Sequence, residues 1–297
     1  MMINTLTRIG GALLRAFPGL ERPVFGLLRT SDMRRIRSLR FRLFKAWVGG
    51  MDSERAIRWV TLPYGLRMMV DVRDWCGITY IEPRAIEPVT TAYLLDHLRP
   101  GDVFADIGAN VGYMSFLAAR CVGTGGAVWS FEPNPRLVLM IRESVRRNQF
   151  EGRVNPVAVA LAEADEPGRP FYVSDQPTNS GLSSLAPDAD HQSLGRMNMC
   201  NPIRITVTTL DRFAADQRIE RFDAVKIDVE GAEHLVVAGM RGLLAQSHPR
   251  FVICETALDS PAAEALGRAG YRRRMLEPMR GDGGWGNVVF ERLEQVP

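Results

Sequence analysis

The sequence predicts an α/β protein built on a doubly wound sheet that is mostly parallel and has an antiparallel last strand. From residue 103 onward, short apolar strands alternate with helical patterns, and this alternation is typical of a parallel sheet with helices on both faces. The first of these strands runs into a glycine-containing loop that opens a helix. In open α/β sheets, ligands bind at that edge. A hydrophobic content of 46% and a charged content of 24% fit a soluble protein with a substantial core.

The individual elements follow from local periodicity and turn residues. Before residue 103 we expect a helix over 31–48, a hairpin or strand over 62–72, and a helix over 87–102 that ends at Pro100-Gly101. The last two strands are joined by a glycine-rich loop without helical periodicity, which favours an antiparallel pair. The expected strands are 103–107, 127–131, 154–160, 203–209, 222–228, 250–255, 271–276 and 287–292, and the expected helices are 111–121, 135–148, 210–216, 231–245 and 260–269.

Charge divides the chain into two domains. Residues 1–60 hold twelve Lys and Arg against four Asp and Glu, a balance of +8; the whole chain carries +3, which leaves −5 for the rest. We therefore expect a basic helical extension over 1–60 and the main domain over 61–297. Within that domain, residues 161–202 lack periodicity and are rich in Asp, Pro, Ser and Gly. We interpret them as an irregular insertion over the active-site edge.

The helix at 31–48 has two interpretations. Its apolar residues recur at helical spacing with arginines between them, so it either lies on an acidic membrane surface or packs on the main domain with its arginines in water. The first interpretation predicts a peripheral contact with the inner membrane face. The sequence lacks the ~18 consecutive apolar residues of a membrane span, and the first twenty residues form a poor signal peptide.

Composition narrows the compartment and the partners. Four scattered cysteines without a C-x-x-C pair, and four histidines, show no metal-ligand set and favour the reducing cytoplasm. The balance of −5 after residue 60 offers no basic stripe for phosphates, so we expect no nucleic-acid partner. The sequence gives no indication of the oligomeric state.

Residues 103–112 (VFADIGANVG) are the first candidate binding motif. Asp106 ends the strand, and Gly108, Asn110 and Gly112 form a loop whose following helix offers free backbone N–H groups. The spacing is D-x-G-x-x-x-G, so the middle glycine of the dinucleotide motif is absent. A carboxylate beside the loop repels a diphosphate and suits a ligand with a cationic end. The alternative is a plain strand–helix turn that needs small residues.

The second strand adds Glu132, 24 residues after Gly108. A carboxylate at that strand end accepts hydrogen bonds from both hydroxyls of a ribose. Asn134, a further cofactor-binding candidate, also fits as the N-cap of a helix that begins at Pro135. Together, these residues describe a nucleoside with an ammonium and carboxylate tail, which is S-adenosyl-L-methionine (SAM). An NAD-dependent oxidoreductase is the alternative enzyme, and a non-catalytic binding module at a membrane surface is the alternative outside catalysis.

At this point the sequence resembles the FkbM family of SAM-dependent methyltransferases. The resemblance rests on PGDVFADIGANVGYMSFLAA, FEPNP, Asn148, TVTTLDRF, and FDAVKIDVEGAEHLVVAGM followed by HPRFVICE, with TNSGLSSL as a looser match, and covers about residues 80–256. It implies a class I methyltransferase (Rossmann-like) sheet and O-methylation of a small-molecule, sugar, glycolipid or polyketide-like hydroxyl acceptor. It further implies that Asp106, Gly108, Asn110 and Gly112 surround the methionine part of SAM, and that Glu132 binds the ribose.

The strand expected over 222–228, which overlaps DAVKIDVEGAEH (223–234), leads to the candidate catalytic residues. In a doubly wound sheet its end lies beside the first strand, next to the transferred methyl group. Lys226 and Asp228 share one side of the strand, and a buried lysine needs a partner, so we expect it to pair with Asp228 or with another carboxylate. Glu230 is a candidate for substrate or metal binding. His234, four residues further on, is the best general base by its ordinary pKa.

Three further predictions concern the acceptor and a metal. Glu255, at the end of the next strand, is a candidate for binding acceptor hydroxyls or a metal. The loop over 179–184 is a candidate for the adenine contact, and its Ser183 and Ser184 are candidate substrate-binding residues. Asp228 and Glu230 could hold a divalent metal ion, although the sequence shows no third ligand. Each of these assignments has a structural alternative, such as helix capping or a buried ion pair.

Overall fold

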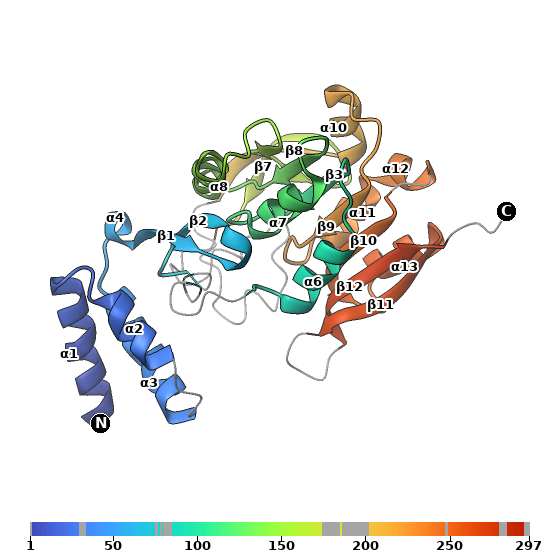
Figure 1. Cartoon of the computed structure of the whole chain (residues 1–297). Coiled ribbons are helices and arrows are strands. Elements are labelled where there is room, and N and C mark those ends of the chain that lie inside the picture. Colours follow the sequence, from blue (N-terminus) through green and yellow to red (C-terminus); the bar gives the residue numbers. More distant parts are fainter. Residues whose placement is uncertain are drawn as a thin grey trace. The chain divides into compact units, whose positions relative to one another are not determined.

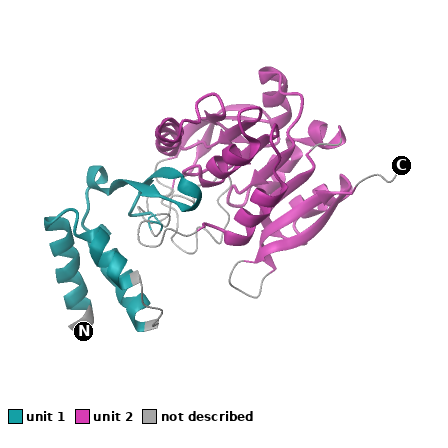
Figure 2. Ribbon diagram, in the orientation of Figure 1, with its two compact units in different colours: residues 1–84, 177–179 teal, residues 85–176, 180–297 magenta. Residues whose placement is uncertain are grey.

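The computed structural model describes residues 2–29, 34–74, 77, 79, 85–173, 185, 202–246, 249–278 and 284–293. The chain divides into two compact units: residues 1–84 with 177–179, and residues 85–176 with 180–297 (Figure 2). The first unit therefore extends past residue 60 and includes residues 62–72, a predicted hairpin or strand that we had assigned to the main domain. None of the described helices combines the length and apolar character that crossing a membrane requires.

Helices dominate the first unit. Its elements are α1 (Met2–Ala16), α2 (Glu21–Arg29), α3 (Arg34–Val48), α4 (Ser53–Ala56), β1 (Ile57–Thr61) and β2 (Arg67–Asp71). Phe25 of α2 packs against Phe44 and Trp47 of α3, with ring centroids 5.9 and 5.5 Å away. Strands β1 and β2 form an antiparallel hairpin. The helix predicted over 31–48 is confirmed from residue 34 onward, and residues 31–33 lie outside the described part.

The second unit is built on a seven-stranded sheet with the order β11-β12-β10-β9-β3-β4-β5 (Figure 1). Strand β12 is antiparallel to both of its neighbours, and the pairs from β10 to β5 are parallel, so the predicted mostly parallel sheet is confirmed. The strands are β3 (Val103–Ile107), β4 (Ala127–Phe131), β5 (Val154–Val157), β9 (Ala224–Ile227), β10 (Phe251–Ala257), β11 (Tyr271–Pro278) and β12 (Trp285–Arg292).

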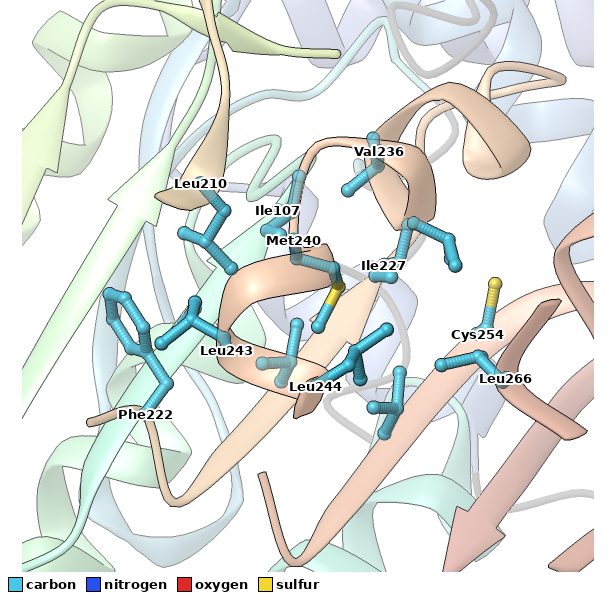
Figure 3. Close-up of a cluster of buried hydrophobic side chains, with 14 of the residues drawn as sticks. Ile107, Leu210, Phe222, Ile227, Val236, Met240, Leu243, Leu244, Cys254 and Leu266 are labelled. Atoms are coloured by element: carbon cyan, nitrogen blue, oxygen red, sulfur yellow. The ribbon is translucent and has the colours of Figure 1, made fainter. Parts of the chain in front are cut away.

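Helices cover both faces of this sheet. On one face, buried side chains of β3, β9 and β10 pack against those of helices from residues 210–268 and form one core (Figure 3). The other face packs against α6 and α7, through contacts such as that of Tyr93 with Phe251. The helices are α6 (Pro88–His97), α7 (Tyr113–Val122), α8 (Pro135–Asn148), α10 (Leu210–Gln217), α11 (Glu233–Ala238), α12 (Arg241–Ala245) and α13 (Pro261–Arg268).

Three strands form a separate small sheet, which corrects two of our predictions. Its order is β6-β8-β7, from β6 (Ala160–Leu161), β7 (Glu166–Phe171) and β8 (Ile203–Thr208). The strand predicted at 203–209 therefore does not join the main sheet, and the insertion at 161–202 contains a strand. The residues of β8 alternate between buried and more exposed, a pattern typical of a strand with one open face. The buried residues of β9 lack this alternation.

The helix predicted over 231–245 is wrong in its start and in its continuity. Helix α11 begins at Glu233 rather than at Gly231, and it ends at Ala238 before α12 starts at Arg241. The start matters for the site, because it leaves Glu230 outside the helix in a turn with a φ of 54°.

Candidate active site

The glycine loop after β3 packs directly against the end of β9. Gly108 has a φ of +80°, and a Cβ atom there would lie 1.8 Å from the backbone oxygen of Asp228. The backbone N–H of Asp228 in turn donates to the Ile107 oxygen at 3.0 Å. Only glycine combines this conformation with so close an approach. The loop therefore lies beside Asp228.

Asp106 lies beneath the glycine loop, on the sheet face covered by α7. Its side chain is buried and accepts a hydrogen bond from Ser115 Oγ at 2.5 Å, while Ser130 Oγ donates to Ser115 Oγ at 2.6 Å. Burial raises the pKa of Asp106, and the nearby Lys226 ammonium and the Ser115 hydrogen bond oppose this rise. The structure thus gives Asp106 a supporting position under the loop.

Glu132, at the end of β4, connects the glycine loop to α8. Its Oε2 accepts from the Asn110 backbone N–H at 2.9 Å, and its Oε1 accepts from the Asn134 backbone N–H at 2.8 Å. These bonds fix the plane of the carboxylate and leave lone pairs on both oxygens. Burial raises the pKa of Glu132 to about 7, against the lowering effect of the two backbone donors.

The two asparagines whose backbone N–H groups bind Glu132 also have distinct side-chain roles. The Asn134 side chain caps α8 by accepting from the Arg136 N–H at 3.1 Å, as predicted. Asn110 has a φ of 52°, which asparagine tolerates better than most residues. Its Oδ1 atom is buried and lacks a hydrogen-bond partner within the described ranges. An orphaned acceptor at the glycine loop fits a ligand that brings a hydrogen-bond donor, such as an ammonium group.

Lys226 is the buried cation of the site. Its Nζ donates to Asp228 Oδ2 at 2.8 Å and lies 3.8 Å from Glu87 Oε2, and only 3% of its side chain is exposed. Burial alone lowers the pKa of Lys226, but the carboxylates of Asp228, Glu87 and Asp106 raise it further, so the net shift is upward. The predicted pairing with Asp228 is confirmed, and the ammonium stays charged at neutral pH.

Sequence reasoning missed Glu87 and Asn287. Glu87 immediately precedes α6, and its Oε2 accepts from Asn287 Nδ2 of β12 at 2.8 Å. Burial raises the pKa of Glu87, and the Lys226 ammonium opposes that rise. Asn287 is 5% exposed, and no described residue hydrogen-bonds its Oδ1. A polar residue in an apolar final strand was the signal available for Asn287, but nothing local linked Glu87 to Lys226.

Glu255 lies on β10, opposite Asn287 of β12 in the sheet register. Its Oε1 accepts from the indole N–H of Trp285 at 3.2 Å. Burial and the negative charge of Asp228 raise the pKa of Glu255 to about 9, while Lys226 opposes the shift. This upward shift favours the protonated carboxylic acid, which can donate one hydrogen bond.

The turn after β9 leads into α11 and carries the remaining predicted residues, Glu230 and His234, to different positions. Glu233 is buried, and its Oε1 accepts from the backbone N–H groups of Gly231 at 3.0 Å and Val229 at 3.3 Å. We had not selected it. His234 is exposed in α11. The helical spacing on which we placed Glu230 and His234 on one side does not apply, because the helix begins only at Glu233.

Two predictions remain, the loop with its two serines and the metal site. The loop over 179–184, predicted to contact adenine and to hold Ser183 and Ser184, lies outside the described residues. Among the residues that are described, no group of three or more His, Cys, Asp and Glu side chains could hold a metal ion. Asp228 instead has an ammonium as its partner, so the Asp228/Glu230 metal site has no support.

The sheet order, the antiparallel β12 and the glycine loop after β3 define a class I methyltransferase fold. The sequence profile of the methyltransferase FkbM domain matches residues 106–272. The chain therefore belongs to the FkbM methyltransferase family, as the sequence motifs predicted.

Individual relatives are more distant. The chain is 32% identical over 163 residues to the Streptomyces tacrolimicus protein named 31-O-demethyl-FK506 methyltransferase FkbM, a match that covers 48% of this chain and 61% of that protein. A solved FkbM methyltransferase from Methylobacillus flagellatus KT has a TM-score of 0.44 at 14% identity, over 91% of this chain and 58% of that one. A Bacillus cereus O-methyltransferase solved with SAH has a TM-score of 0.41 at 13% identity, over 69% and 81%.

Proposed function

We propose that the protein is a SAM-dependent O-methyltransferase that acts on a hydroxyl group of a small-molecule, sugar, glycolipid or polyketide-like acceptor. The observation that carries this proposal is the packing of the glycine loop against the Asp228 backbone. It brings a cofactor-type loop and a cation-paired carboxylate to the same point of the sheet edge. Membership of the FkbM family supports methyl transfer, and the name of the Streptomyces relative supports an oxygen acceptor.

The residues around the loop fit SAM. The orphaned Asn110 Oδ1 is an acceptor for the α-ammonium group, and the fixed Glu132 carboxylate has lone pairs left for ribose hydroxyls. Asp106 would act from beneath, by adding negative charge under the cationic part of the ligand. When bound, SAM supplies a methyl group that its sulfonium has already activated.

Asp228 is the residue that we assign to the acceptor hydroxyl. Methyl transfer forms a C–O bond and breaks a C–S bond, and the hydroxyl proton must leave; a carboxylate can accept it. The Lys226 hydrogen bond uses Asp228 Oδ2 and holds the side chain in one orientation, while 21% of that side chain stays exposed. Orientation of this kind is a large part of catalysis in an in-line displacement.

Glu255 and Asn287 suit the binding of a hydroxylated acceptor. Glu255 can donate a hydrogen bond as a neutral acid, and Asn287 Oδ1 can accept one. The pair lies across β10 and β12 on the sheet face that also carries Lys226. A polyol or glycoside presents hydroxyls that both donate and accept, which matches this combination.

Calorimetric titration with SAM tests the cofactor part of the proposal. We expect binding, and no detectable heat at millimolar ligand would overturn it. A thermal-shift comparison tests the rival oxidoreductase: S-adenosylhomocysteine should raise the melting temperature and NAD should not. A shift with NAD alone would instead favour the oxidoreductase.

The Asp228→Asn variant tests where the chemistry lies. Turnover would be followed as release of S-adenosylhomocysteine over a panel of glycosides and polyhydroxylated macrolides. We expect turnover to fall roughly 10²–10⁴-fold and S-adenosylhomocysteine affinity to stay unchanged, because asparagine keeps the acceptor for Lys226. The matched control is Asp216→Asn, at an exposed aspartate of α10. Full turnover in Asp228→Asn would show that the carboxylate is not the proton acceptor.

We also propose that the protein works in the cytoplasm without a nucleic-acid partner. Cys121 and Cys254 are free thiols, as expected for a reducing compartment. The acidic balance after residue 60 disfavours a phosphate backbone as a ligand.

A further inference from the structure

Helix α1 packs on α3 along a narrow face and exposes most of its large apolar residues. It packs on α3 through Gly11, where a Cβ atom would lie 2.5 Å from the Ala46 carbonyl carbon. Thr7 and Leu14 of the same helix are also buried. Side chains larger than hydrogen at Gly11 would push the two helices apart. The close approach thus uses little of the apolar surface that α1 carries.

The large apolar residues of α1 lie on another face. Leu6, Ile9, Leu13 and Phe17 are three or four positions apart, so they form one stripe along the helix and into the turn after it. They are 60%, 53%, 54% and 57% exposed, and Leu20 beyond them is 51% exposed. A helix of a soluble domain normally turns such a stripe toward a core. Contiguous exposed apolar surface marks an interaction site.

The same helical segment is strongly basic. Residues 1–48 contain nine arginines and Lys45 against Glu21 and Asp32, a balance of +8. Arg35, Arg37 and Lys45 are exposed on α3. Two copies of this segment would repel each other at such a charge. The charge therefore disfavours self-association and complements an anionic surface.

We propose that the apolar stripe of α1 binds the surface of an anionic lipid bilayer. Helices that lie in a membrane interface combine an apolar stripe with Arg-rich surroundings, and anionic lipids add electrostatic attraction. This proposal places the contact on α1 rather than on 31–48, where sequence periodicity placed it. In α3 the aromatic residues Phe44 and Trp47 pack against Phe25 inside the unit.

Vesicle co-sedimentation of the full chain tests this proposal. We expect the protein to pellet with vesicles of equal phosphatidylcholine and phosphatidylglycerol, and not with phosphatidylcholine alone. The double variant Leu13→Glu/Phe17→Glu should partition at least ~10-fold more weakly, because two apolar side chains no longer leave water. Both positions are exposed, so circular dichroism should show an unchanged fold. The matched control, Leu139→Glu, alters a leucine of α8 that is 60% exposed, and should bind like the wild type.

The possible outcomes distinguish lipid binding from self-association of the protein. Absence of binding to the anionic vesicles, or equal binding by the double variant, would overturn the proposal. Light scattering provides the other arm. A dimer that dissociates in Leu13→Glu/Phe17→Glu would assign the stripe to self-association instead.

Discussion

At the β3–β4 end of the site, the neutral-donor end, buried carboxylates are held by uncharged donors, whereas at the β9–β10 end, the cation end, partly exposed carboxylates surround an ammonium. Asp106 and Glu132 accept from a serine hydroxyl and from backbone N–H groups. Asp228 and Glu87 lie around the Lys226 ammonium. Neutral donors fix the position of a carboxylate without cancelling its charge, so its pKa is free to respond to burial. A cation lowers the pKa of nearby carboxylates, but at Glu87 burial outweighs the Lys226 ammonium and the pKa is still raised. The first end is suited to holding a ligand, and the second to holding a base.

Removing the cation should have the largest effect on the stability of the cation end. Lys226→Met leaves Asp228 and Glu87, whose side chains are 21% and 24% exposed, without their cation. Loss of one partner of a buried pair costs roughly 3–5 kcal/mol of unfolding free energy, and we expect a loss at the lower end of that range. Chemical denaturation would measure it. Lys45→Met is a matched control, since Lys45 is the other lysine of the chain and is exposed. Equal stability of the two variants would mean that neutral groups, not the ammonium, hold this end together.

At the neutral-donor end, the contribution of Glu132 to the unfolding free energy should instead depend on pH. Glu132 has an ordinary pKa of 4.5 and a pKa of about 7 in the fold. The folded protein keeps a proton that the unfolded chain has lost, so the stability contribution of Glu132 falls as pH rises from 4.5 to about 7. The difference corresponds to about 3 kcal/mol. Glu132→Gln should remove this part of the pH dependence.

The design isolates ionisation from hydrogen bonding. Glutamine offers only one carbonyl oxygen for the two backbone donors, but that loss costs the same at every pH. Denaturation at about pH 5 and about pH 8 should therefore show a smaller stability difference in Glu132→Gln than in the wild type. The control Glu151→Gln, at an exposed site, should retain the wild-type difference. An unchanged pH dependence in Glu132→Gln would show that Glu132 is ionised in the fold.

The neutral-donor end was largely predictable from the sequence. The bounds of β3 and β4 agree with our predictions because short apolar runs ending in Asp106-Ile107 and Phe131-Glu132 carry their own signal. A strand end also places its acid at the sheet edge. The neutral-donor end was therefore predictable from local pattern, including the role of Asn134 as a cap.

The cation end depended on contacts that are remote in sequence. Glu87, just before α6, meets Lys226 and Asn287 only because α6 packs on the sheet and places Glu87 beside side chains of β9 and β12. The start of α11 is fixed by Glu233, which binds the turn backbone, rather than by the glycine that we used as a boundary. The separate sheet of β8 was readable in principle, since its residues alternate between buried and more exposed.

The smallest effect is expected for Glu87→Gln, a variant that tests which carboxylate is the stronger partner of Lys226. Glu87 Oε2 lies 3.8 Å from Nζ, against 2.8 Å for Asp228 Oδ2, so Asp228 provides the stronger attraction. Glutamine at position 87 keeps an oxygen for Asn287 Nδ2, and burial already penalises the charge of Glu87. We expect Glu87→Gln to change the unfolding free energy by about 1 kcal/mol or less, well below Lys226→Met. A loss as large as that of Lys226→Met would mean that the buried ammonium depends on both carboxylates, and that Glu87 is as much its partner as Asp228.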